Sequence, residues 1–171
     1  MKLVNQFLLF TALATHTVGA STLTVTTTAD SGVGSLRAAL KNARDGDTIK
    51  FSLPAASTIR LTGGELLVSK SVNILGPGVG NLAVSGNHAS RVFRISSRTT
   101  VTITGLTIAN GVAGSGGGIF SDHATLTVSN CFVTGNSATT GIGGGILSDG
   151  HTFQDPTVGA TLTASIGRER R

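Results

Sequence analysis

One segment of this sequence occurs twice. Residues 114–122 read GSGGGIFSD and residues 141–149 read GIGGGILSD, so seven of nine residues are identical at an offset of 27. Self-similarity at a period of about 20 to 50 residues is typical of repeat architectures, in which one unit cannot bury its apolar face alone. The chain is therefore predicted to fold as successive copies of one unit.

The segments beside this motif repeat the alternation of apolar and polar residues. Residues 100–111 (TVTITGLTIANG) match residues 125–136 (TLTVSNCFVTGN) at an offset of 25, which places Ile103 opposite Val128. Fainter copies occur earlier in the chain at offsets of 24 and 29, and later at an offset of 36. A period of two indicates half-buried strands. The unit is thus a set of short strands with insertions of varying length.

Short strands separated by glycine, asparagine and serine favour a parallel β-helix. Each strand is too short to bury its own apolar side chains, so like strands of successive units must stack in parallel at about 4.8 Å. The period of two excludes ankyrin, TPR and HEAT repeats, which are helical. A β-sandwich remains the alternative, because regular short strands also suit it. We predict an all-β short solenoid of about four coils, spanning residues 59–165.

The composition agrees with this fold class. Charged residues make up 12% of the chain, which contains neither tryptophan nor tyrosine. A charged helical bundle and a disordered polyelectrolyte are therefore poor fits. The net charge of +5 comes largely from the two ends of the chain. The other basic residues are scattered, with no aromatic platform between them, so we expect no nucleic-acid partner.

The N-terminus resembles an export signal. Lys2 precedes an apolar run over residues 7–14, and small residues follow up to Ala20. This run is too short for a membrane span, although a buried N-terminal helix or a membrane anchor is an alternative. We predict a signal peptide over residues 1–20, cleaved after Ala20. The protein would then be secreted or displayed on the cell outer membrane surface.

A short helix is predicted in the N-terminal region. Leu36 and Leu40 recur at helical spacing, Ser35 precedes them as a candidate N-cap, and Gly46 lies just past the end. Because a helix with one apolar face must cover something, we expect residues 21–58 (strand, helix, strand) to cap the open end of the stack.

The last residues do not complete a coil. Residues 160–165 (ATLTAS) resemble residues 124–129 (ATLTVS), but residues 166–171 form an irregular basic tail instead of the next strand. We expect the chain to be an incomplete, truncated product of a longer repeat protein.

Several segments resemble a known family of bacterial surface proteins. Residues 24–51 resemble the N-terminal cap that precedes right-handed parallel β-helix repeats in exported proteins. The GGGI segments at 116–119 and 143–146, with VTGN at 133–136 between them, are similar to the repeat of the polymorphic outer membrane protein family. That repeat is usually GGA with an aliphatic residue, followed by FxxN.

This resemblance implies a pectin-lyase-like, right-handed parallel β-helix that is exported and displayed at the outer membrane or released. Gly118 and Gly145 stand where the family repeat has alanine, and Val133 stands where it has phenylalanine. The match is therefore to the repeat type. Long members are anchored by a C-terminal barrel or sorting segment, so outer membrane association is expected to depend on a C-terminal segment missing here.

Polysaccharide lyases share this scaffold, so a metal site has to be considered. Asp122 and Asp149 occupy equivalent places and should lie one above the other about 5 Å apart. Stacked carboxylates repel unless they are solvated or share a cation, which suggests a Ca²⁺ site with His123 and His151 nearby. The alternative is a solvated turn, because aspartate favours turns. No other cofactor is expected.

Other polar residues are expected to have structural roles. Gly118 and Gly145 should shape corners of the coil, since glycine tolerates close backbone approach. Asn110 and Asn136 close similar segments and should form part of an amide ladder. Cys131 is the only cysteine, so it cannot form an intrachain disulfide and should be a small buried apolar residue.

The sequence favours a function in contact rather than catalysis. Three arginines at positions 91, 94 and 98 are spaced to face a sugar acid, but a solvated strand explains them equally well, and no Ser-His-Asp set is recognisable. We expect a structural or adhesive display protein whose partner is a glycan or cell surface. The alternatives are a fragment of a pectin-lyase-like polysaccharide-degrading enzyme and a non-functional remnant.

Overall fold

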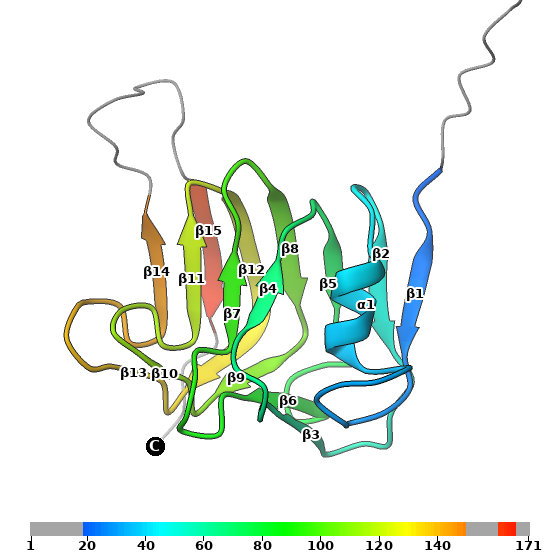
Figure 1. The fold of residues 1–171 in the computed structure, drawn as a ribbon, viewed down its shortest axis with the longest axis horizontal. Coiled ribbons are helices and arrows are strands. Elements are labelled where there is room, and N and C mark those ends of the chain that lie inside the picture. Colours follow the sequence, from blue (N-terminus) through cyan, green and yellow to red (C-terminus); the bar gives the residue numbers. More distant parts are fainter. Residues whose placement is uncertain (1–18, 150–160, 167–171) are drawn as a thin grey trace, which may run out of the picture.

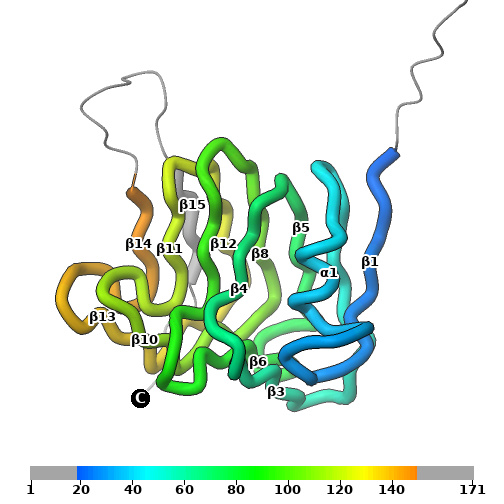
Figure 2. The backbone as a smooth tube through the Cα atoms, viewed as in Figure 1, coloured from blue at the N-terminus to red at the C-terminus, as the bar shows by residue number. Residues whose placement is uncertain are grey.

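The chain winds into turns that stack along one axis, as Figure 2 shows. The computed structural model describes residues 19–149 and the backbone of residues 161–166. All the strand pairs described are parallel, and together they form a solenoid of about five turns. The predicted signal peptide lies outside the described residues apart from Gly19 and Ala20, as does the predicted tail apart from Ile166.

Three sheets run along the stack, and like strands of successive turns are neighbours (Figure 1). Sheet A contains β1 (Thr22–Val25), β2 (Thr48–Phe51), β5 (Asn73–Leu75), β8 (Thr100–Thr104), the first half of β12 (Thr125–Thr134) and β15 (Thr161–Ile166). Sheet B contains β3 (Ser57–Arg60), β6 (Leu82–Ser85), β9 (Thr107–Ala109) and the second half of β12. Sheet C contains β4 (Leu66–Val68), β7 (Phe93–Ile95), β11 (Ile119–Asp122) and β14 (Ile146–Asp149). A short pair, β10 (Val112–Ala113) and β13 (Ser137–Ala138), follows the second corner.

The predicted stacking of equivalent residues is confirmed. Val128 is the parallel register partner of Ile103, and Ile146 is that of Ile119. The parallel pairing of all these strands excludes the β-sandwich alternative. The prediction of about four coils is slightly low, because β1 and α1 (Leu36–Asn42) form a first turn that does not carry the repeated motif.

The core consists of columns of aliphatic side chains inside the coil. In sheet A, Ile49, Ile74, Ile103 and Val128 follow one another in register, and none of them is exposed. Because adjacent strands in a sheet lie about 4.8 Å apart, each side chain rests on its counterpart in the next turn. Burial of these columns is what a single short strand could not achieve alone.

Helix α1 occupies the place next to β4 at the N-terminal end of sheet C, against β1 and β4 (Figure 1). The predicted N-cap is confirmed, since the Ser35 hydroxyl accepts a hydrogen bond from the Ala38 N–H at 3.2 Å. Leu36 and Leu40 are buried, so the apolar face of the helix covers the core. No helix among the described residues is long and apolar enough to cross a membrane.

The helix ends earlier than Gly46 suggests. Its last residue is Asn42, and Ala43 is already extended, with φ −63° and ψ 150°. The Asp47 carboxylate accepts a hydrogen bond from the Arg44 N–H at 2.8 Å, and the Asp47 N–H donates to the Arg44 carbonyl at 3.1 Å. These two bonds close a separate turn, to which Gly46 belongs (φ 90°).

One inner column of sheet C changes from apolar to polar along the stack. Val68 and Ile95 are followed in register by Ser121 and then Ser148. The hydroxyl oxygens of both serines are buried without a hydrogen-bond partner among the described residues. The later turns therefore have a less apolar interior on this side than the earlier ones.

Candidate functional site

The outer face of sheet C carries a row of side chains in register. Leu67, Arg94, Phe120 and Leu147 lie on neighbouring strands at equivalent positions. Their neighbours before and after on β4 and β7 are buried, so strand alternation places these residues outside. Leu67 is 52% exposed and the Arg94 side chain 48% exposed. We call these four residues the sheet C row.

Arg91 braces one side of this row. Its guanidinium pairs with the Glu65 carboxylate and donates to the carbonyls of Ser115 and Gly116, both at 2.9 Å. The guanidinium carbon also lies 5.1 Å from the centre of the Phe120 ring, within the range of a cation–π contact. Arg91 therefore links residues of three successive turns and is engaged on all sides.

The Arg94 side chain makes fewer contacts with the protein than that of Arg91 and is more exposed. Its ion-pair partner among the described residues is the Glu65 carboxylate, at 3.7 Å, and nearly half of its side chain is exposed. Exposed pairs of this kind contribute little to stability. The third arginine, Arg98, lies outside the row, at a corner where its φ is 62° and its N–H donates to the His123 carbonyl at 3.0 Å. The structure thus brings together two of the three arginines.

Asp122 and Asp149 are register partners on β11 and β14, as predicted. The Asp122 Oδ1 atom lies 2.6 Å from His123 Nδ1, and His123 Nε2 is buried without a partner among the described residues. No group of three or more histidine, cysteine or acidic residues within residues 19–149 is placed to hold a metal ion. Ca²⁺ takes about six to eight oxygen ligands, and the described residues do not bring such a set together. The calcium site therefore stays a prediction. His151 lies outside the described residues.

Cys131 is buried, with 1% of its surface exposed. Burial raises the pKa of its thiol, which outweighs the backbone hydrogen bonds from Leu106, Gly105 and Ser129 that lower it. A thiol held protonated is a poor nucleophile. The geometry fits the predicted role as a small core residue.

Asn110 and Asn136 both serve the second corner of the coil, but in different ways. The Asn136 amide donates to the Ile108 carbonyl at 2.9 Å and accepts from the Gly111 N–H at 2.7 Å. Asn110 instead takes a left-handed conformation, with φ 53°, as does Gly135 one turn later with φ 62°. Asn136 therefore joins two turns through backbone groups, and no Asn110–Asn136 amide ladder occurs in this part of the structure.

The glycines that replace the family alanine lie where backbones approach closely. A β-carbon on Gly118 would clash with the carbonyl oxygen of Gly145 one turn later, and would come within 3.0 Å of the Asn136 amide nitrogen. At Gly145 the nearest atom would be a methyl carbon of Val133, at 3.2 Å. The backbone therefore excludes alanine at Gly118. At Gly145 a small shift of the Val133 side chain would accommodate it.

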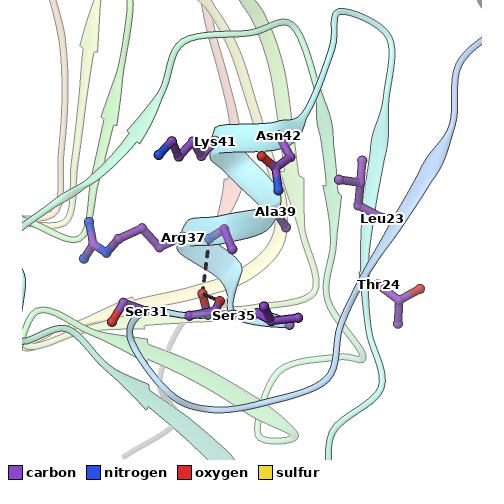
Figure 3. Close-up of a pocket in the computed structure, with 12 residues that line it drawn as sticks. Leu23, Thr24, Ser31, Ser35, Arg37, Ala39, Lys41 and Asn42 are labelled. Atoms are coloured by element: carbon purple, nitrogen blue, oxygen red, sulfur yellow. Dashed lines mark hydrogen bonds between the residues drawn. The ribbon is translucent and has the colours of Figure 1, made fainter.

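A hollow of about 700 Å³ opens beside α1 at the N-terminal end (Figure 3). Leu23 lies on one side of the helix, while Arg37 and Lys41 extend from the other side. Arg37 is engaged with Asp30 and with the carbonyls of Gly64 and Glu65. None of the candidate site residues predicted from the sequence lines this hollow.

Sequence reasoning missed the other members of the sheet C row and their partner Glu65. The signal that would have found Phe120 and Leu147 is their shared place directly after the two GGGI segments. Leu67 lies in an earlier turn without that motif.

Because comparisons with known proteins gave no match, inference about function rests on the fold and on the geometry of the site. No family model matches the chain, and no curated protein or solved structure matches it either.

Proposed function

We propose that this chain is an exported β-helix protein that acts by contact, with the outer face of sheet C as its binding surface. The observation that carries the proposal is the sheet C row, in which a half-exposed guanidinium lies between apolar side chains in register. A row of this kind on a rigid stack offers the same geometry before and after binding, so little ordering cost is incurred.

The chemistry of the row favours an acidic glycan as the partner. Arg94 can donate paired hydrogen bonds to a carboxylate or sulfate, which is the geometry that a planar guanidinium suits. Leu67 and Phe120 flank it in register and can contact the apolar faces of sugar rings. Arg91 is already engaged with protein groups. We therefore assign it to holding the surface in shape.

We also infer that the repeat belongs to the type found in polymorphic outer membrane proteins. The recurrence of GGGI one turn apart, with Ile119 and Ile146 in register, supports this assignment. Export through the predicted signal peptide and display at the cell surface, or release, follow from it. A role as a polysaccharide-degrading enzyme is the competing outcome of the tests below.

Binding of an acidic polysaccharide such as polygalacturonate to the chain from Ser21 onward tests the proposal. We expect Arg94→Gln to weaken binding about tenfold, because loss of a charge-assisted contact removes over 1 kcal/mol. Arg60→Gln is the matched control, since Arg60 is exposed on sheet B and its loss changes the net charge equally. Equal loss in both variants would contradict a site on sheet C.

The same mixtures separate contact from turnover. A contact protein leaves the polysaccharide intact, whereas a lyase releases unsaturated sugars that absorb in the ultraviolet. Appearance of that absorbance in proportion to protein concentration would overturn the contact function in favour of the enzyme.

A further inference from the structure

Ser21 is held at the start of the first strand by a buried carboxylate. The Ser21 backbone N–H donates to Asp47 Oδ1 at 2.7 Å, and the Ser21 hydroxyl donates to the same oxygen at 2.9 Å. The other oxygen, Oδ2, accepts the Arg44 N–H. In addition, the Ser21 carbonyl accepts the Thr48 N–H at 2.8 Å. The nitrogen of Ser21 is thus aimed at the carboxylate and fixed on it.

Asp47 lacks the partner that a buried carboxylate usually has. It is 3% exposed, yet no lysine, arginine or histidine side chain among the described residues forms an ion pair with it. Buried charges are normally paired with an opposite charge. Hydrogen bonds from the backbone N–H groups of Arg44 and Ser21 nevertheless hold the pKa of Asp47 below its usual value. The carboxylate is therefore ionised, and the positive charge of Arg44 acts on it only from beyond ion-pair distance.

Cleavage of the bond before Ser21 would supply a cation in direct contact with this carboxylate. Hydrolysis of the Ala20–Ser21 amide adds one water molecule, which leaves a carboxylate on Ala20 and an amine on Ser21. That amine takes up a proton at neutral pH, since α-amino groups have pKa values near 8. Both residues are exposed, so the bond is accessible.

We propose that Asp47 is the receptor for the amino group released at Ser21 when the precursor is cut after Ala20, so that maturation adds an ion pair at the first strand. This inference rests on the export component of the proposed function. The single amide N–H on Asp47 Oδ1 becomes an ammonium with three donors and a full charge. Strand β1 pairs only with β2 among the described strands, so the new ion pair would fasten the end of sheet A.

The pairing is tested on two forms of the chain that begins at Ser21, one with a free amino group and one Nα-acetylated. We expect the free form to have the higher midpoint of thermal unfolding at pH 7. An ion pair raises the folded-state pKa of the ammonium above its unfolded value, so its contribution is complete below about pH 8 and is lost as the pH rises through the folded value. Equal midpoints at pH 7 would overturn the pairing.

The acetylated form keeps every side-chain charge, including those of Arg44, Asp45 and Lys50, which are close to Asp47 in the sequence, and that of Lys70 beside Ser71, so it controls for their titration. Asp47→Asn should abolish the difference between the two forms. Asp45→Asn is the matched control and should preserve it, because Asp45 accepts the Ser71 N–H at 2.7 Å instead of a bond from Ser21. A difference that persists in Asp47→Asn contradicts the proposal.

A second measurement serves if Asp47→Asn does not fold. The Ser21 amine of the unaltered protein should react with an acylating reagent at pH 8 at least tenfold more slowly than the amine of a peptide with the same first residues. Equal rates would show that the amine is not paired.

The position of the cut is checked separately, by the mass of the protein exported from a bacterium that expresses the full chain. A mass that corresponds to residues 21–171 supports cleavage after Ala20. An uncut chain overturns the maturation step and with it the export component. An exported chain cut elsewhere overturns the maturation step alone, and equal midpoints in a correctly cut chain overturn the pairing alone.

Discussion

At the level of single residues, one tight constraint on this fold is the approach of one turn to the next at Gly118. Alanine at this position would force its β-carbon against the backbone carbonyl of Gly145, which cannot move without disturbing the next turn. We expect Gly118→Ala to lower the free energy of unfolding by about 2 kcal/mol, in the range of overpacked cores.

Gly145→Ala is the control, because among the residues that the structure describes its β-carbon would meet a side-chain methyl group of Val133 and no backbone atom. It should cost less than about 1 kcal/mol. Urea denaturation of both variants measures the difference, and equal costs would contradict the close approach inferred at Gly118.

A substitution at Ser121 is expected to raise the free energy of unfolding instead of lowering it. Its hydroxyl is buried in a column that Val68 and Ile95 fill in earlier turns, and it has no hydrogen-bond partner among the described residues. Removing an unpaired buried hydroxyl should be favourable. We expect Ser121→Ala to raise the free energy of unfolding by about 1 kcal/mol. A loss of stability in urea denaturation would indicate that the hydroxyl has a partner.

Single residues also mark where sequence reasoning succeeds and where it fails. The neighbouring positions of Asp122 and Asp149 were predictable, because two nearly identical segments must stack in register. The contact between Glu65 and Arg91 was not, because Glu65 precedes a turn without the motif. The conformation of Asn110 escaped for another reason. The residue one turn after Asn110 is Gly135 and not Asn136, so the two asparagines do not occupy equivalent positions.

At the level of elements, side chains fasten loops of different turns to one another. Arg91 contacts Glu65, Ser115, Gly116 and Phe120 at once. A lysine keeps the charge but cannot donate in three directions from a planar group. We expect Arg91→Lys to lower the free energy of unfolding by about 1 to 2 kcal/mol.

Arg94→Lys is the matched control, since the long contact of Arg94 with Glu65 lies on the surface and should contribute little. Chemical denaturation of the two variants compares them directly. A larger loss for Arg94→Lys would contradict the bracing role of Arg91.

Asp30 joins the loop before α1 to the segment before β4. Burial opposes its ionisation, but hydrogen bonds from Arg37 and from the Gly63 and Thr62 N–H groups outweigh it and lower the pKa. A carboxyl with a lowered folded-state pKa contributes stability above its unfolded pKa of about 4, and this is lost as the pH falls through the folded value.

Asp30→Asn should therefore be less stable than the unaltered chain at pH 7 and should lose less stability on acidification. Denaturation at several pH values between about 7 and 2 measures this. Part of the acid sensitivity should remain, because the pKa of Asp47 is lowered as well. A variant with the same pH profile as the unaltered chain would contradict the role of Asp30.

The elements show why the number of turns was underestimated. Helix α1 and its cap were predictable from Ser35 and the spacing of Leu36 and Leu40. The first turn, with β1 and α1, was expected to be a cap and not a coil, because it contains a helix and lacks the glycine cluster. Alternation alone identifies a strand but not its place in a stack, so the parallel pairing of β1 with β2 became evident only in the structure.

At the level of the whole molecule, stability depends on uninterrupted columns of side chains. Ile103 lies in the middle of the sheet A column, with β5 on one side and β12 on the other. We expect Ile103→Ala to lower the free energy of unfolding by about 3 to 4 kcal/mol, as for other large cavities in cores. Because a turn contacts only its neighbours, hydrogen exchange should accelerate most in β8 itself and in the adjacent strands β5 and β12.

Leu67→Ala is the control, because Leu67 is large and apolar but half exposed. It should leave the free energy of unfolding within about 0.5 kcal/mol of the unaltered chain. If the two variants lost equal stability, the inner columns would not be the main support of the molecule.

The in-register stacking has one further consequence, for how such a molecule can change its length. Duplication of a whole unit would insert a complete layer, and the outward groups above and below it would keep their alignment. Insertion of a single residue within a strand would turn every later side chain of that strand to the opposite face. Genes for proteins of this build can therefore grow or shrink by entire modules while the pattern they present to a partner stays in phase.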